Sequence, residues 1–315
     1  MELYSSSTNE IMRRSDCEPM IGELAALGAA LSWTASALLY RKALQETQPV
    51  LANIVRLVLT STILIVFVTV IGKLGTFATL PYNVVILAAV SGIIGLGVGD
   101  TLYMVSLKMV GVARGVPITC TYPLFTLLFA FTLAGQPPTL TVSLGAILIV
   151  AGIWLVSTER NSSTTASRKL LLLGVVMGIA TAILWAVSIT LMNLAVNYNR
   201  QLDSALAVNT IRVTAIGAAF AASAPLLYKR HRLTKMSRKT VLSLIAGGLV
   251  ALGLGWFFLS YSLTVIEESR AVPISSVTPL FSTLTAALLF HEKITMENAL
   301  GSVLIVIGIF IIFLL

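Results

Sequence analysis

The chain is built largely from apolar runs of about twenty residues, separated by short polar connections. An α-helix rises about 1.5 Å per residue, so a run of this length spans the hydrocarbon core of a bilayer, which is about 30 Å thick. Hydrophobic residues make up 57% of the 315 residues and charged residues only 11%, whereas soluble domains carry about 25% charged residues. We therefore expect an all-α integral membrane protein with ten transmembrane helices, at 21–44, 50–71, 83–107, 113–134, 138–157, 170–195, 203–227, 240–264, 271–290 and 294–315.

The charged residues lie mainly at the ends of these runs and give a formal net charge of +8. Basic residues in such places fix the orientation of membrane helices, so the charge does not indicate a nucleic-acid partner. Residues 1–19 are polar and lack the apolar segment of a signal peptide, and we interpret them as a disordered leader. The two cysteines, Cys17 and Cys120, indicate neither a disulfide framework nor a metal site.

The sequence lacks the common motifs of enzymes. It contains no H-E-x-x-H, no G-x-S-x-G and no P-loop. The segment GLGVGD at 95–100 has alternating glycines, but it lies inside an apolar run and does not follow a strand. We expect that the protein is not an enzyme and that it binds no cofactor and no metal.

The second half of the chain repeats the first. Residues 91–156 align without a gap on 247–312 after a shift of 156 positions, and roughly 24 of the 66 aligned pairs are identical. The segment RGVPITCTYPLF at 114–125 returns as RAVPISSVTPLF at 270–281. Matched prolines, arginines and glycines indicate a duplication, because convergence of apolar composition would match scattered leucines and valines instead.

The repeat divides the chain into a first unit at 20–157, a Ser/Thr-rich linker at 158–169 and a second unit at 170–315. Each unit contains five predicted helices. Because five is odd, the second unit must enter the membrane from the opposite side. The fold expected from the sequence is therefore a pair of inverted five-helix repeats, an arrangement that places a binding site near the midplane between the halves.

Two prolines interrupt the predicted helices at 113–134 and 271–290. Pro123 removes the hydrogen bond that would end on the carbonyl of Thr119, and Pro279 does the same at Ser275. We expect both helices to bend at these prolines. A carbonyl freed inside a membrane is tolerated where protein, hydroxyl groups or water satisfy it.

The bent face of each helix carries hydroxyl side chains. Such a stripe can form hydrogen bonds between packed helices, worth about 0.6 kcal/mol each, or it can line a water-filled central cavity. We favour the cavity because the bend and the hydroxyl groups share one face in both copies. The residues concerned are Thr119, Tyr122 and Thr126 in the first copy and Ser275, Thr278 and Ser282 in the second.

Asp100 is the clearest difference between the repeats, because its aligned partner is Trp256. An acidic side chain inside a membrane helix costs a few kcal/mol and usually faces a cavity or an ionic partner. Asp100 is therefore a candidate for proton coupling or substrate binding. The alternative is a structural ion pair with an arginine.

Other residues that match between the two halves are expected to have structural roles. The motif N-x-x-R at 53–56 returns at 209–212, and its symmetric placement favours a structural role for Arg56 and Arg212. Trp33 is matched by Trp185 after a four-residue slip.

Small residues recur every four positions at 91–99 and at 247–255. Such stripes let helix backbones approach closely. We expect these two helices to pack tightly against their neighbours.

With a tryptophan in the first helix of each half, an arginine in the second and R-x-V-P-I-x-x-x-x-P-L-F in the fourth, the chain resembles the EamA-like family of the drug/metabolite transporter superfamily. The resemblance covers residues 20–315. It implies a bundle of two inverted repeats that exports or exchanges small metabolites, often amino acids, through a cavity between the repeats. On this template the residues that line the cavity are Trp33, Tyr103, Thr119, Tyr122, Trp185, Ser275 and Thr278.

The orientation in the membrane stays open. Lys and Arg are concentrated in the loops after the odd-numbered helices, above all in YKRHRLTKMSRK at 228–239. The positive-inside rule then places both termini outside. The family resemblance implies that both termini lie inside.

We expect a secondary transporter, an exporter or exchanger of small organic metabolites such as amino acids, that works by alternating access. The alternative is an uncoupled facilitator or channel for small solutes. Its partners would be the substrate, the lipid bilayer and, if Asp100 couples transport, protons, with no nucleic acid, and it would act as a monomer or a homo-oligomer. We expect a multi-pass protein of the cell membrane, that of a prokaryote rather than an organelle.

Overall fold

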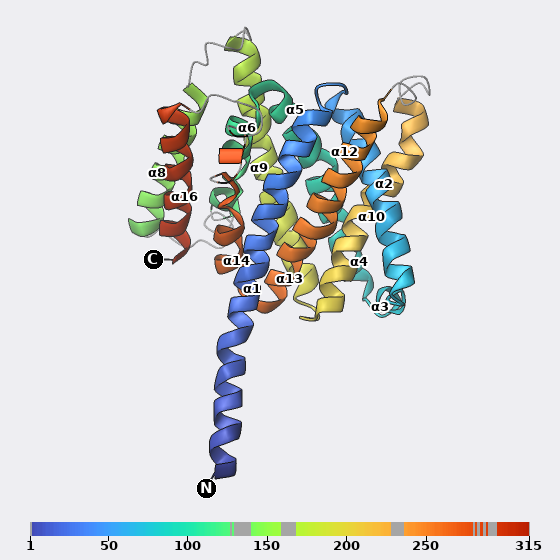
Figure 1. The fold of residues 1–315 in the computed structure, drawn as a ribbon, viewed down its shortest axis with the longest axis vertical. Coiled ribbons are helices and arrows are strands. Elements are labelled where there is room, and N and C mark those ends of the chain that lie inside the picture. Colours follow the sequence, from blue (N-terminus) through green and yellow to red (C-terminus); the bar gives the residue numbers. More distant parts are fainter. Residues whose placement is uncertain are drawn as a thin grey trace.

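The computed structural model describes residues 2–126, 128, 140–158, 168–227, 236–279, 281, 284–285, 288 and 295–314. The secondary structure in these ranges is helical throughout, and the long helices stand side by side in a bundle (Figure 1). The predicted all-helical membrane architecture is confirmed, since six of the described helices are long and apolar enough to cross a bilayer. They are Pro19–Ala43, Pro49–Val70, Tyr82–Val110, Lys169–Val196, Leu202–Ser223 and Arg238–Val265.

Two shorter apolar helices, Leu144–Leu155 and Met296–Ile311, accompany these six. Most of the predicted runs coincide with a described helix to within a few residues. In chain order the elements are α1 (Glu2–Ala43), α2 (Pro49–Val70), α3 (Gly75–Ala78), α4 (Tyr82–Gly92), the π-helical segment η1 (Ile93–Gly99), α5 (Asp100–Val110), α6 (Val112–Thr119), α8 (Leu140–Thr158), α9 (Arg168–Val196), α10 (Leu202–Leu227), α12 (Arg238–Gly248), the π-helical segment η2 (Leu249–Gly255), α13 (Trp256–Val265), α14 (Glu268–Ser275) and α16 (Met296–Leu314).

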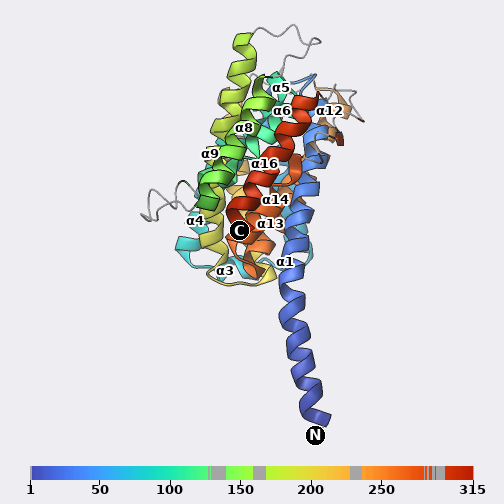
Figure 2. The same ribbon diagram turned by 90° about the vertical axis from the view of Figure 1, so that its left-hand side faces the viewer.

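Helix α1 extends well beyond the run predicted for it. It begins at Glu2, and its first turns project from the bundle as one long helix (Figure 2). Residues 1–19, which the sequence analysis expects to be disordered, are thus helical from Glu2 onward in the structure. Extending an existing helix is far easier than nucleating a new one, and the helix continues through Pro19.

Two of the long helices contain a π-helical segment at matching positions of the repeat. η1 joins α4 to α5, and η2 joins α12 to α13. A π-turn disturbs the regular pattern of backbone hydrogen bonds, and such turns occur frequently at functional sites. The side-chain amide of Asn53 donates to the carbonyls of Leu96 and Gly97, both at 3.0 Å, and that of Asn209 donates to the carbonyl of Leu252 at 2.8 Å. The repeated asparagines therefore bind the carbonyls of the π-segments.

Helices α6 and α14 differ from the bent helices expected at Pro123 and Pro279. Each ends four residues before its proline, the chain makes a two-residue turn, and the helical conformation resumes one residue before the proline. Each proline thus lies at the start of a new helical stretch, where its missing N–H removes no helical hydrogen bond. An interrupted helix replaces the predicted continuous bend for this reason.

Helices α8 and α16 pack closely at one edge of the bundle (Figure 1, Figure 2). A Cβ added to Gly152 would lie 2.6 Å from the carbonyl oxygen of Gly301, and one added to Gly308 would lie 2.6 Å from that of Gly145. The early part of each helix therefore meets the late part of the other, so the two helices run antiparallel. The four glycines are two pairs of repeat mates.

The first long helix of each half packs into the other half. Helix α1 lies against α12, α13 and α14, and helix α9 lies against α4, α5 and α6. The two halves are therefore joined along an interface that runs through the middle of the bundle. Side chains from both halves meet at this interface.

Candidate functional site

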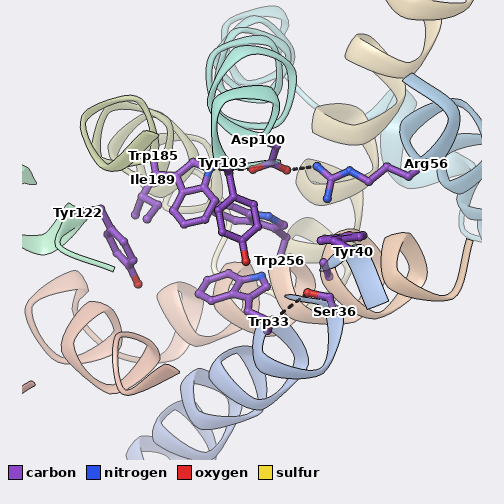
Figure 3. Close-up of a pocket in the computed structure, with 11 residues that line it drawn as sticks. Trp33, Ser36, Tyr40, Arg56, Asp100, Tyr103, Tyr122, Trp185, Ile189 and Trp256 are labelled. Atoms are coloured by element: carbon purple, nitrogen blue, oxygen red, sulfur yellow. Dashed lines mark hydrogen bonds and ion pairs between the residues drawn. The ribbon is translucent and has the colours of Figure 1, made fainter. Parts of the chain in front are cut away.

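A small cavity lies at this interface (Figure 3). Its volume is about 30 Å³, which is enough for about two water molecules. The central chamber expected from the sequence is thus narrow in this conformation. Its walls are formed by Trp33, Ser36, Tyr40, Arg56, Asp100, Tyr103, Tyr122, Trp185, Ile189, Ala251 and Trp256.

Aromatic rings form most of the wall. Trp33 and Trp256 meet edge to face with their centroids 5.1 Å apart. Trp185 lies 5.2 Å from Tyr103, 6.2 Å from Tyr122 and 6.3 Å from Trp256. These separations are those of stabilising aromatic pairs. The cavity therefore presents ring faces and edges to an apolar group, although its walls must separate from their present positions before such a group fits.

Matched glycines set the positions of the two repeated tryptophans. A Cβ on Gly255 would lie 2.7 Å from Nε1 of Trp33, and a Cβ on Gly99 would lie 3.1 Å from Cδ1 of Trp185. The small residues predicted to allow close helix packing thus make room for rings that come from the other half of the chain. Both glycines end a π-segment, directly before Asp100 and Trp256.

Asp100 binds the first-half arginine. Its carboxylate pairs with Arg56 and accepts a hydrogen bond from Nε1 of Trp185 at 2.8 Å. Arg56 also donates from Nε to Oδ1 of Asn53 at 2.9 Å, and its guanidinium lies 4.7 Å from the ring centroid of Tyr40. Figure 3 shows the pair at the edge of the aromatic cluster. The structural ion pair considered for Asp100 is thus present, and it links α2, α5 and α9.

The second-half arginine has different partners. Arg212 donates from Nε to Oγ of Ser91 at 2.9 Å and from a terminal nitrogen to Oγ of Ser188 at 3.0 Å. A second terminal nitrogen donates to the thioether of Met192. The guanidinium lies 4.3 Å from the ring centroid of Trp256. Within the described ranges, no carboxylate forms an ion pair with Arg212.

Most of the predicted hydroxyl stripe lies outside the cavity wall that the aromatic residues form. Thr119, Thr126 and Thr278 each donate to a backbone carbonyl three or four residues earlier, and none of them lines the cavity. Ser275 hydrogen bonds the hydroxyl of Tyr122 at 2.7 Å and thereby joins the two interrupted helices. Thr119 and Thr126 are thus satisfied within their own helices, whereas Thr278 also donates to the carbonyl of Ala30 on α1 at 3.4 Å and Ser275 bonds between helices.

Both halves of the chain match one known protein family. Residues 20–158 and 172–314 each match the sequence model of the EamA-like transporter family. The chain belongs to the EamA-like transporter family. The family consists of transporters and not of enzymes, in agreement with the expectation from the sequence. The protein is thus a multi-pass membrane protein with two EamA domains.

Two relatives extend over nearly the whole EamA chain. An uncharacterized transporter of Archaeoglobus fulgidus (strain ATCC 49558 / DSM 4304 / JCM 9628 / NBRC 100126 / VC-16) is 23% identical over 295 residues, which cover 94% of this chain and 99% of the relative. A protein known from a crystal structure superposes with a TM-score of 0.66 at 19% identity, and the match covers 93% of this chain and 96% of that one. At this identity the second relative establishes only that the fold is shared.

Several residues of the EamA site were not selected from the sequence. The sequence alignment of the two halves could have identified Trp256, because it aligns with Asp100, which was selected, and it is aromatic like the selected residues Trp33 and Trp185. Ser36 and Tyr40 lie about one and two turns after Trp33 on α1 and so share its face. Of the predicted lining residues, Ser282 lies outside the described part of the chain. The cavity residues that the sequence did not single out are Ser36, Tyr40, Ile189, Ala251 and Trp256.

The cavity is lined by side chains that suit binding of a small molecule. Among the described residues there is no group of His, Cys, Asp or Glu side chains that could hold a metal ion. The cavity wall combines aromatic rings with the Arg56–Asp100 pair, whose charges can orient a small organic molecule. This combination suits a transporter family.

Proposed function

We propose that the protein is a secondary transporter that moves small organic metabolites across the cell membrane of a prokaryote by alternating access. Its ten predicted spans form two five-helix repeats of opposite orientation, and the central cavity is the substrate site. The observation that carries this proposal is the reciprocal packing of α1 and α9 into the opposite halves around the cavity.

Matched contacts on the two halves support the inverted arrangement. The glycine contacts between α8 and α16 are antiparallel and pair repeat mates. The asparagine contacts to η1 and η2 are repeat mates as well. Contacts of this kind are expected when two copies of one unit are related by a pseudo-two-fold axis in the membrane plane.

Polar contacts between the halves close the bundle at both ends. Near α3, Lys73 pairs with Asp203 at 2.6 Å. At the start of α12, Ser237 donates a hydrogen bond to Glu46 at 2.7 Å. A narrow cavity with links at both ends is consistent with an occluded conformation. Alternating access then requires that the two ends open in turn.

Counterflow in proteoliposomes tests the proposal. Vesicles that contain the purified protein are loaded with one metabolite of a panel, and uptake of the same labelled metabolite is followed. A carrier accelerates uptake when substrate is present on the far side. Absence of counterflow for every metabolite, with protein that remains monodisperse, contradicts the proposal, and a conductance of many solutes per opening would identify a channel instead.

Proton coupling through Asp100 is part of the same proposal. Protonation of this carboxylate would release Arg56, so the protonation state and the packing of α2, α5 and α9 would change together. The test is transport by Asp100→Asn under an imposed pH gradient. A gradient-driven flux that is identical in the variant and the unmodified protein would exclude Asp100 as the coupling group.

A further inference from the structure

The centre of the bundle carries more positive than negative charge. Among the described residues, Arg56, Arg212 and Asp100 are each at most 2% exposed, so at the centre two buried cations share one buried anion. Arg114 on α6 is also buried, but it does not line the cavity. A buried charge without a counter-ion is costly, and inside a membrane such residues are usually functional. One positive charge therefore remains to be balanced, and it lies in the second half, where none of the described carboxylates forms an ion pair with Arg212.

Neutral groups orient Arg212 without neutralising it. Ser91 and Ser188 each donate their own hydroxyl hydrogen to the backbone carbonyl of the other, at 2.7 Å and 2.8 Å. Their oxygen lone pairs are thereby left to accept from the guanidinium. The third acceptor, the sulfur of Met192, is a weak one. These contacts fix the direction of Arg212, which is a requirement for selective binding.

The repeat shows which group is missing. Arg56 has a carboxylate partner because Asp100 directly follows η1. In the second half the residue that directly follows η2 is Trp256, and its ring covers Arg212 at 4.3 Å. A cation–π contact is worth about 0.5–2 kcal/mol and leaves the net charge unchanged. The position that a carboxylate occupies in one half is thus occupied by an aromatic ring in the other.

We propose that Arg212 binds the carboxylate of a monoanionic organic acid, whose apolar body lies among the aromatic side chains of the cavity. This inference rests on the proposed transport function and names its substrate class. Trp256 both lines the cavity and covers Arg212. The cavity measures about 30 Å³ in this conformation, so substrate binding requires its walls to separate. Rotation of the Trp256 ring away from the guanidinium would then join Arg212 to the enlarged space.

The charge balance selects a monoanion. One carboxylate neutralises the excess of the two arginines over Asp100. A zwitterion brings an ammonium group that restores the excess, an amine raises it, and a neutral amide leaves it unchanged. The aromatic walls select the rest of the molecule, since ring faces favour an apolar or aromatic body over a strongly hydrated one.

A matched ligand series tests the inference on the unmodified protein. Binding of 3-phenylpropionate, 3-phenylpropionamide and 2-phenylethylamine to the purified full-length chain is measured by tryptophan fluorescence and by thermal shift. Hydrogen bonds to charged groups are worth about 1.5–3 kcal/mol, so the amide is expected to bind at least about tenfold more weakly than the acid. The amine is expected to bind more weakly still. Amide or amine binding that equals that of the acid would overturn the inference.

Two variants locate the carboxylate site. Arg212→Gln removes the cation, and Trp256→Asp supplies an internal carboxylate at the position that Asp100 holds in the first half. Both are expected to weaken 3-phenylpropionate binding by at least about tenfold, whereas Lys169→Gln, which removes an exposed positive charge, serves as the control and leaves binding unchanged. Unchanged binding in a folded Arg212→Gln protein would overturn the inference, and if neither variant folds, the ligand series decides.

Transport assays separate this inference from the proposed function. Counterflow of neutral or cationic metabolites alone, with equal rates in Arg212→Gln, would overturn the carboxylate site and leave the transport function intact. Binding of 3-phenylpropionate that depends on Arg212, without flux of any solute, would support the site and overturn the transport function. Counterflow of the acid that is lost in Arg212→Gln supports both.

Discussion

Gly308 on α16 lies directly against the backbone of Gly145 on α8, where an added Cβ would come within 2.6 Å of the carbonyl oxygen. Gly152 and Gly301 make the same contact in the reverse order. These antiparallel contacts bring the last helices of the two halves to backbone distance. Because the four glycines are two aligned pairs, these contacts follow the sequence repeat.

Substitution of Gly152 or Gly308 by a larger residue should therefore push α8 and α16 apart. Gly152→Val and Gly308→Val each force a side chain against backbone that cannot give way, and overpacking of this kind costs about 1–3 kcal/mol. Thermal unfolding of the purified protein measures the effect. Gly75→Val is the matched control, since a Cβ at Gly75 meets no atom within 4 Å. Equal stability of all three variants would contradict the close approach.

Two of the described ion pairs differ strongly in burial and should therefore differ in their contribution to stability. The side chains of Arg56 and Asp100 are 1% and 4% exposed, whereas those of Lys73 and Asp203 are 44% and 38% exposed. Asp100→Ala leaves a buried arginine unpaired and should cost about 3–5 kcal/mol of unfolding free energy.

Asp203→Ala removes an exposed pair and should cost about 0–1 kcal/mol. Chemical unfolding in detergent, followed by tryptophan fluorescence, compares the two variants under identical conditions. A larger loss for Asp203→Ala than for Asp100→Ala would contradict the assignment of the buried pair as a structural element.

The repeated asparagines should contribute unequally, although they are repeat mates. The amide nitrogen of Asn53 donates to two carbonyls of η1 and to Thr101, and its oxygen accepts from Arg56. Asn209 donates to Leu252, while its side-chain oxygen is buried without a partner. Asn53→Ala should therefore cost about 2–3 kcal/mol and Asn209→Ala about 1 kcal/mol. Unfolding midpoints that fall equally would show that the extra contacts of Asn53 contribute nothing.

Much of the fold could be predicted because the hydrophobic runs and the repeat are properties of the sequence itself. The π-segments could not, since glycines at 95, 97 and 99 are equally compatible with a regular helix packed closely against a neighbour. The expectation that the threonine hydroxyl groups line the cavity met a related difficulty. A threonine in a helix can satisfy itself on the carbonyl one turn earlier, as Thr119 and Thr278 do, so its sequence position does not fix what it faces.

The central asymmetry of the site was visible in the sequence, but its meaning was not. The alignment of Asp100 with Trp256 shows that one half has an acid and the other does not. Only the structure shows that Arg56 and Arg212 are both buried in the bundle and that Asp100 forms its ion pair with Arg56. The charge left on Arg212 is a consequence of packing across the two halves, which spacing along one helix does not reveal.

Glu46 links the two halves of the chain at the α12 end of the bundle. It lies between α1 and α2, outside the membrane spans. Its carboxylate accepts hydrogen bonds from the hydroxyl groups of Thr240 and Ser237 at the start of α12. These bonds, first that of Thr240, hold the pKa of Glu46 below its usual value of 4.5. The carboxylate form is thus favoured in the folded state, and the link joins the two halves of the chain.

This link should make the stability of the protein depend on pH in a defined direction. Because the pKa of Glu46 is lower in the folded than in the unfolded chain, its contribution is present above pH 4.5 and is lost as the pH falls through the folded value. Glu46→Gln should therefore lower the thermal unfolding midpoint at neutral pH and make no difference well below pH 4.5. Thr240→Val, which removes the first donor, should shift the midpoint in the same direction. A constant difference between Glu46→Gln and the unmodified protein across this range would show that the carboxylate does not titrate with folding.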